Sequence, residues 1–173
     1  LIAKISENHH RTINLINKIE NILIFLKEDI IQNFSNTIIF NIFVHNRRIL
    51  LFLFKEKFII IDEYIYSILN SQDHYVEYFQ PELISYLLKT EKKPETIFNE
   101  KRLKGENPNH ICQLIRNDSI DDFIIYVNKN NVSLSTEIES SFFETNSFLE
   151  PYRSVSMIEY SAFFGSIKIF RYL

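Results

Sequence analysis

The stretch SVSMIEYSAFFGSIKIFRYL, residues 154–173, decides the fold. Ser156 stands where a helix begins, because a serine hydroxyl can accept a backbone N–H of the first turn. Gly165 suits the left-handed backbone that ends a helix, and Ser166 is placed to cap a second one. The stretch therefore predicts two helices joined by a tight turn.

The apolar residues of this stretch predict which faces of the two helices are covered. Ile158, Ser161 and Ala162 should form the inner face of the first helix, where small residues let two helices approach closely. Ile169, Phe170 and Leu173 should form an apolar face on the second helix. That face needs a neighbour to cover it, so we expect this edge to stack on further repeats.

A second, poorer copy of the pattern precedes it as HICQLIRNDSIDDFIIYV, residues 110–127. Asp118 takes the place of Gly165, and Ser119 takes the place of Ser166. The two turns are 47 positions apart (165 − 118), against about 33 in ankyrin-type arrays. The excess falls between residues 128 and 155, where we expect a long connection.

The final stretch resembles an ankyrin repeat, whose consensus is TPLHLAAxxGHxEIVKLLL. Ser156 stands at the threonine of that pattern, Ala162 at its second alanine and Gly165 at its glycine. Met157 replaces the proline and Glu159 replaces the histidine. The usual threonine–histidine hydrogen bonding at the helix start is therefore not guaranteed here.

Longer stretches resemble the ankyrin-repeat family expanded in trichomonad protists, which carries a domain of unknown function ahead of its repeats. They are EKRLKGENPNHICQLIRNDSIDDFIIYVNKNNVSLS (residues 100–135) and IESSFFETNSFLEP (residues 138–151). The resemblance implies an all-α chain in which a divergent helical region, residues 1–103, continues into a truncated ankyrin-type solenoid, residues 104–173. Helix pairs are expected at about 108–127 and 156–173. The family brings no known activity or ligand.

The N-terminal region should be helical too. Apolar residues at three- and four-residue steps predict one long helix over residues 3–33. Ser35 with Asn36 should cap a second helix, Pro81 suits the first turn of another, and Pro94 could open a short helix that Gly105 closes.

Residues 49–61 leave two alternatives open. Two apolar runs flank a charged triplet, which fits either a β-hairpin or helices on both sides of Lys57; we favour the helices. The sequence also does not decide whether residues 1–99 are divergent repeats or a separate bundle.

Composition excludes several classes of protein. Only two glycines and four prolines disfavour a tight-turned all-β fold. A net charge of −3 gives the chain no overall positive potential that would attract nucleic acid. No stretch supplies the roughly 20 uncharged residues of a membrane span. The single cysteine, Cys112, fits a reducing compartment, so we expect a cytoplasmic protein. Because the sequence starts at Leu1 and stops inside an apolar helix, we expect a fragment.

No motif in the sequence carries catalytic or metal chemistry. His110 and Cys112 offer two ligands where zinc wants four. Two glycines cannot build a phosphate-binding loop, and H-E-x-x-H is not present. We therefore expect no cofactor, no metal and no enzymatic activity.

The favoured function is that of a non-catalytic protein-interaction module, an ankyrin-like scaffold or adaptor. Tyr152 and Arg153, in the long connection, are the candidate partner-binding residues; the partner itself is not identified by the sequence. One alternative is that the N-terminal region is a small-molecule or catalytic domain targeted by the repeats, which a pocket gathering His9, His45, Asp62, Glu63 and His74 would favour. Another is a self-associating structural module built on residues 1–69.

Overall fold

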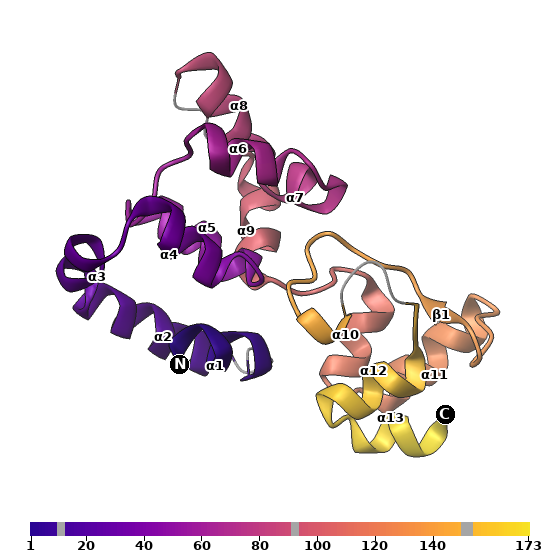
Figure 1. Cartoon of the computed structure of the whole chain (residues 1–173). Helices are drawn as coiled ribbons and strands as arrows, with labels where there is room; N and C mark the ends of the chain where they lie inside the picture. Colours follow the sequence, from indigo (N-terminus) through magenta and orange to yellow (C-terminus); the bar gives the residue numbers. More distant parts are fainter. Residues whose placement is uncertain (10–12, 91–93, 150–153) are drawn as a thin grey trace. The chain divides into compact units, whose positions relative to one another are not determined.

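The structure is a computed structural model that describes residues 1–9, 13–90, 94–149 and 154–173 (Figure 1). Within these residues the chain forms thirteen α-helices, one short 3-10 helix and one pair of two-residue strands. The all-α prediction is therefore confirmed. No helix in the described part of the chain is long and apolar enough to cross a membrane.

The chain divides into two compact units. Unit 1 comprises residues 1–105 and 145–147, and unit 2 comprises residues 106–144 and 148–173. The division after Gly105 lies two residues from the boundary expected from the sequence. Each unit is described separately below.

Nine helices of unit 1 lie in its described residues. They are α1 (Ile2–His9), α2 (Ile13–Phe25), α3 (Lys27–Asn33), α4 (Asn36–Phe43), α5 (Arg47–Lys55), α6 (Glu63–Leu69), α7 (Asp73–Tyr78), α8 (Gln80–Leu88) and α9 (Thr96–Lys104).

Helix α5, RRILLFLFK, is the centre of the unit 1 core. Its residues Ile49, Leu50, Leu51 and Leu53 are all buried. A helix that is apolar on nearly every side must be surrounded by other elements. The remaining buried core residues of unit 1 come from the elements around it: Ile16, Ile19, Leu23, Ile39, Phe40, Phe43, Phe58, Ile59, Ile65, Leu69, Tyr75, Tyr78, Phe79 and Leu83.

The single long helix predicted for residues 3–33 is wrong. Helix α2 ends at Phe25 and α3 begins at Lys27, because Leu26 has φ −94° and ψ 8°, outside helical geometry. Leu23 on α2 is buried, whereas α3 has no fully buried residue. The break therefore separates a helix that belongs to the core from one that lies on the surface. Residues 10–12 lie outside the described part.

The hairpin alternative for residues 49–61 is also wrong, since α5 is helical through Lys55. Beyond it, however, the expected helix starts late. Lys57 adopts left-handed backbone (φ 56°), and the chain is not helical again until Glu63. The extended part is paired by a side chain: the Ile60 N–H donates to Asn36 Oδ1, and Asn36 Nδ2 donates to the Ile60 carbonyl, both at 2.9 Å.

Several predicted helix boundaries are confirmed. Ser35 caps α4 by accepting from the Ile38 N–H at 3.4 Å, and Pro81 lies in the first turn of α8. Gly105 ends α9 in the left-handed conformation, with φ 66°. Pro94 precedes α9, which begins at Thr96.

Unit 2 is built on two helix pairs. The first is α10 (His110–Arg116) with α11 (Ile120–Lys129), and the second is α12 (Met157–Phe164) with α13 (Ile167–Tyr172). Helix α10 packs on α12, and α11 packs on α13, as Figure 1 shows.

The connection between the pairs carries strand β1 (Glu137–Ile138), the 3-10 helix η1 (Ser147–Leu149) and strand β2 (Val155–Ser156). The strands pair antiparallel, with Glu137 opposite Ser156 and Ile138 opposite Val155. The connection therefore returns to the start of α12 as a short ladder.

Gly105 is tightly enclosed within unit 1. Its carbonyl accepts from the N–H and the hydroxyl of Thr145, at 3.1 and 3.0 Å. A β-carbon at this position would lie 2.6 Å from Thr145 Oγ1 and 3.3 Å from Arg48 Cδ. At Gly165, with φ 70°, a β-carbon would meet nothing within 4 Å.

We predict that Gly105→Ala destabilises the protein more than Gly165→Ala. Both substitutions carry the left-handed backbone cost of about 1 kcal/mol. Only Gly105→Ala also displaces a packed neighbour, which adds about 1–3 kcal/mol. Urea denaturation followed by circular dichroism measures both; equal losses of stability would contradict the enclosure of Gly105.

Candidate functional site

The two helix pairs of unit 2 turn in the same way. In the first pair the Ser119 N–H donates to the Leu114 carbonyl at 3.1 Å; in the second, the Ser166 N–H donates to the Ser161 carbonyl at 2.9 Å. The donor and acceptor of the second bond each lie 47 positions after those of the first (166 − 119), so the two turns have the same backbone hydrogen bond. The left-handed residue of the turn is Asp118 (φ 50°) in one pair and Gly165 (φ 70°) in the other.

Each pair begins with a side-chain cap. The side-chain Oδ1 of Asn109 accepts from the Ile111 N–H at 3.2 Å, at the start of α10. At α12, Ser156 and Glu159 form a capping box: the Glu159 N–H donates to Ser156 Oγ at 3.3 Å, and the Ser156 N–H donates to Glu159 Oε2 at 3.0 Å. Glu159, which departs from the ankyrin consensus, thus provides the second half of the cap.

The Asp118 carboxylate joins the first pair to the second. It accepts from the Lys168 N–H at 3.0 and 3.2 Å and from the Ile169 N–H at 3.1 Å. These N–H groups belong to the first turn of α13, where backbone donors lack helical partners and the helix dipole favours a negative charge. Asp118 therefore caps a helix 50 positions away in sequence (168 − 118).

Ser166 makes the reciprocal contact, and the role predicted for it is wrong. Its side chain makes no capping bond to α13. Its hydroxyl instead donates to the carbonyl of Ile115 in α10. The side chain of Ser119 makes no capping bond to α11 either. Ser166 is buried, and its hydroxyl finds a partner in the neighbouring pair because Asp118 already supplies the cap of α13.

The inner face of α12 also differs from the prediction. Met157, Tyr160 and Ser161 are buried, whereas Ile158 and Ala162 are exposed. Helix α12 packs on both α10 and α13, and its buried Tyr160 contacts Arg116 of α10. Ile158 and Ala162 lie on the other side of α12.

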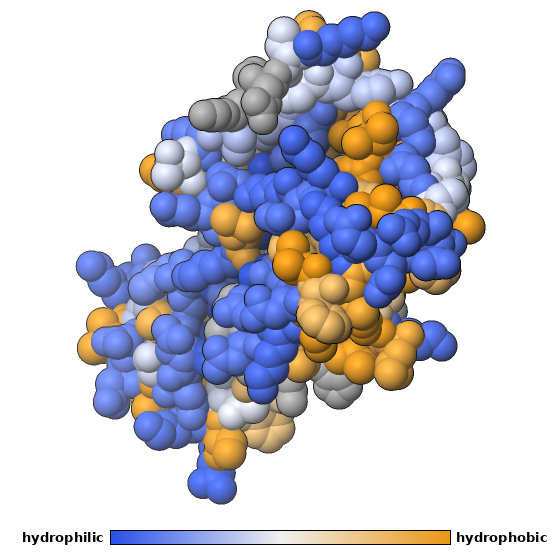
Figure 2. Space-filling view, turned by 90° about the vertical axis from the view of Figure 1, so that its left-hand side faces the viewer, coloured by the Kyte–Doolittle hydropathy of each residue, from blue (hydrophilic) through white to orange (hydrophobic). Residues whose placement is uncertain are grey.

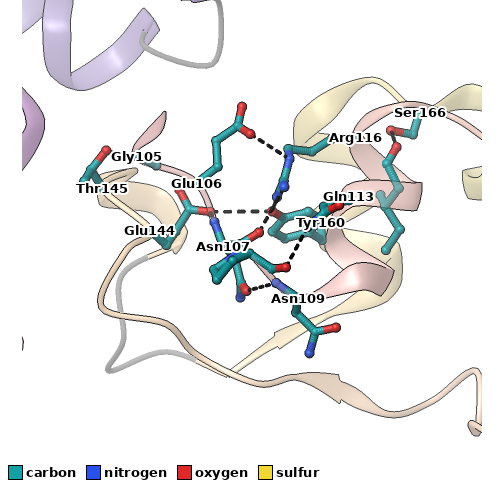
Figure 3. A network of polar contacts seen from close by, with 12 residues as sticks. Gly105, Glu106, Asn107, Asn109, Gln113, Arg116, Glu144, Thr145, Tyr160 and Ser166 are labelled. Atoms are coloured by element: carbon teal, nitrogen blue, oxygen red, sulfur yellow. Dashed lines mark hydrogen bonds and ion pairs between the residues drawn. The ribbon is translucent and has the colours of Figure 1, made fainter. Parts of the chain in front are cut away.

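A network of polar contacts centred on Arg116 holds the segments of unit 2 together (Figure 3). Arg116 Nη1 donates to the Tyr160 hydroxyl at 2.6 Å, and Nη2 donates to the Asn107 carbonyl at 2.9 Å. Its Nε lies 3.2 Å from a carboxylate oxygen of Glu106. One guanidinium thus joins α10, α12 and the segment that leads into α10.

Glu144 attaches the long connection to the same network. Its carboxylate accepts from the Asn107 N–H at 3.1 Å and from the Tyr160 hydroxyl at 3.5 Å. Asn107 Nδ2 donates to the Glu139 carbonyl at 2.8 Å. Part of the connection is therefore fixed against unit 2: Phe143, Glu144 and Leu149 are buried.

The Cys112 thiol and the Tyr160 phenol, both buried in unit 2, keep their protons. Burial raises the pKa of Cys112 to about 12, against the opposing effect of Arg116. Burial, followed by the nearby Glu144 carboxylate, also raises the pKa of Tyr160. A buried thiol in this protonated state is a poor nucleophile. The His110 ring lies against Tyr126, with centroids 5.1 Å apart. The network therefore supports the packing of unit 2.

Asp62 and His74, two residues of the alternative small-molecule site, both make local contacts. Asp62 caps α6 by accepting from the Ile65 N–H at 2.8 Å. His74 is buried against Tyr75, and burial followed by repulsion from Arg47 lowers its pKa to about 4. Two pockets in the described part of unit 1, of about 440 and 380 Å³, are lined by none of His45, Asp62, Glu63 and His74. The side chain of His9 lies outside the described part.

Two further observations complete the site. The described residues contain no group of three or more His, Cys, Asp or Glu side chains placed to hold a metal ion. Tyr152 and Arg153, the candidate partner-binding residues, lie outside the described residues.

Sequence reasoning missed the residues of the Arg116 network. Arg116, Asn107, Glu144 and Tyr160 belong to no motif, and Glu144 and Tyr160 are distant in sequence from Arg116. For Asp118 a signal existed, because aspartate tolerates left-handed backbone and is a favoured helix cap. What the sequence did not indicate is that the capped helix belongs to the following pair.

No family model, no curated protein and no solved structure matches this chain. The resemblance to ankyrin repeats, and to the trichomonad family, therefore stays a prediction.

We predict that Asp118→Ala lowers the free energy of unfolding of unit 2 by about 1–2 kcal/mol, the usual cost of losing a helix cap. Asp118→Gly loses the same cap but removes the left-handed strain of about 1 kcal/mol, so it should be less harmful. Cys112 is the single cysteine and is buried, so its rate of labelling by a thiol reagent reports unfolding of unit 2. Equal labelling rates for Asp118→Ala and the unaltered chain would contradict the capping role.

Proposed function

We propose that the chain is a non-catalytic protein-interaction module of the ankyrin type, in which unit 2 is a stack of helix pairs that continues with a further pair. The observation that carries this proposal is the apolar edge of α12 and α13.

Adding 47 to a residue of the first pair gives its equivalent in the second. Ile111 is 7% exposed and Phe123 is 0% exposed. Their equivalents, Ile158 (111 + 47) and Phe170 (123 + 47), are 43% and 44% exposed. The first pair is covered by the second, so the second offers the same kind of apolar surface with nothing upon it. Ile167, which follows Ser166, extends this surface at 60% exposed.

The occupant best suited to this edge is a third helix pair. A terminal repeat of a solenoid normally turns a polar face outward, because an apolar one is sticky in water. This edge is instead built from the residue types that the first pair uses to bind the second. An array of this kind presents an extended surface to protein partners, which is the function we propose.

The long connection offers a second surface to a partner. Its residues 143–146 and 149 are buried, whereas most of residues 133–140 are exposed, among them Glu137 and Glu139. We propose that this exposed part contacts the partner, in addition to the candidate residues Tyr152 and Arg153.

Self-association is the second candidate function. Hydrophobic side chains reach the surface in patches between hydrophilic ones on the face shown in Figure 2. In unit 1 the exposed large hydrophobic residues include Phe25, Phe34, Ile38 and Ile42. A structural assembly through these residues would be independent of the edge of unit 2.

The stacking proposal predicts that an added helix pair stabilises unit 2. We would append, after Leu173, a designed pair with one apolar face and one charged face. Covering Ile158, Ile167 and Phe170, each already partly buried, should raise the free energy of unfolding of unit 2 by about 2–4 kcal/mol. Cys112 labelling measures this gain.

The matched variants decide whether the gain comes from this edge. Ile158→Asp should abolish it, because a buried aspartate without a partner is costly. Ile125→Asp, at another exposed isoleucine of unit 2, should preserve it. The proposal would be contradicted if the added pair did not raise the free energy of unfolding, or if both variants kept the increase. Self-association through unit 1 is tested separately from this gain in stability, by measuring the mass of Phe25→Asp in solution by light scattering.

A further inference from the structure

One pocket in unit 1 has a volume of about 440 Å³. Pockets that bind small molecules usually span about 300–1,000 Å³ and combine an apolar wall with a few polar groups. Here Phe54, Ile59 and Tyr86 contribute apolar surface, while Lys55, Asn99 and Glu82 contribute the polar groups.

The left-handed turn at Lys57 creates one wall of this pocket. It ends α5, and the residues 58–61 that follow belong to no helix or strand; Phe58 lies against Phe52 of α5, with ring centroids 6.2 Å apart. Tyr86 of α8 contributes another wall and is held by stacking on Tyr66, with ring centroids 5.1 Å apart and an interplanar angle of 28°. The apolar surface is therefore built by packed elements of the fold.

The amide of Asn99 is fixed in one orientation. Its Oδ1 accepts from Lys55 Nζ at 3.2 Å and from Arg102 Nη2 at 3.3 Å. Two cations on one oxygen exclude the flipped amide, which would place an N–H group against both of them. Asn99 Nδ2 consequently has two N–H donors with no hydrogen-bond partner among the described residues.

Lys55 makes no ion pair within the described residues, although the carboxylates of Glu82, Glu20 and Glu56 lie near enough to oppose the lowering of its pKa. Its ammonium carries three donors, and its one hydrogen bond within the described residues is to Asn99. The ion pairs found there join other cations: Arg48 to Glu20, Arg102 to Glu82 and Arg116 to Glu106. Burial, followed by repulsion from Arg102, lowers the pKa of Lys55.

Glu82 lines the pocket, but its charge is already compensated. Its Oε2 accepts from Arg102 Nη1 at 2.6 Å, and Arg102 is fully buried. Arg102 Nε is buried with no hydrogen-bond partner in the described part. With Lys55 and Lys57 also lining the pocket, its polar end offers donors and positive charge in excess.

We propose that this pocket binds a small amphipathic carboxylate, with the carboxylate accepting from Lys55 Nζ and Asn99 Nδ2 and the apolar body lying against Phe54, Ile59 and Tyr86. A carboxylate supplies acceptors where the pocket supplies donors, and its charge is opposite to that of the two lysines, Lys55 and Lys57, that line the pocket. This ligand site is independent of the helix-pair edge of unit 2.

The test is isothermal titration of the whole chain with octanoate, and with octanol and octylamine as matched neutral and cationic probes. We expect octanoate to bind with a Kd of about 0.1–1 mM, as befits a ligand of this size. Octanol should bind at least about tenfold more weakly, because it lacks the charge-assisted hydrogen bonds.

Two lysine variants identify the group that binds the carboxylate. Lys55→Met keeps the apolar stem and should weaken octanoate about tenfold or more while leaving octanol unchanged. Lys18→Met, an exposed lysine of α2, makes the same change in net charge and should leave octanoate binding unchanged.

Several results would overturn the proposal: no octanoate binding at millimolar concentrations, octanol or octylamine binding as tightly as octanoate, or equal effects of Lys55→Met and Lys18→Met. Circular dichroism confirms that both variants fold. Because none of these measurements involves α12 or α13, their failure leaves the stacking proposal standing.

Discussion

The carboxylate of Asp118 is the group on which the arrangement of unit 2 most depends. The backbone of Asp118 has the left-handed conformation of the first turn, and its carboxylate accepts from the Lys168 and Ile169 N–H groups of α13. The hydroxyl of Ser166 returns the contact by donating to the Ile115 carbonyl. Two turns with the same backbone bond are therefore joined in a fixed register, and that register decides which side chains of α12 and α13 are covered.

The long connection between α11 and α12 is bonded to the same helix pairs. A chain that leaves α11 and returns to α12 must satisfy its own backbone groups, and it does so through Glu144, Asn107 and the strand pair β1–β2. Asn107 and Tyr160 are the fixed points to which it attaches, and Arg116 holds both of them. The connection is thus partly core and partly surface, and only its surface part is free to contact a partner.

Sequence reasoning found what is local and missed what is long-range. Ser156, Gly165 and Gly105 were identifiable because caps and left-handed turns depend on neighbouring residues. The break at Leu26 was not, since apolar spacing continues through it and only the change from core to surface distinguishes α2 from α3. The partner of Ser166 and the Arg116 network depend on contacts between distant segments, which no periodicity reports. The pocket in unit 1 is of the same kind, because Lys55 and Asn99 are 44 positions apart (99 − 55).

Native-state hydrogen exchange by NMR tests the central claim most directly, because it measures each amide of the two helix pairs separately. If the pairs form one stack, the Ile169 amide at the Asp118 cap should open with the same free energy as the amides in the core of α10. In Asp118→Ala, protection of both should fall together. Rapid exchange of Ile169 beside a protected α10, in the unaltered chain, would contradict a stack held by this cap.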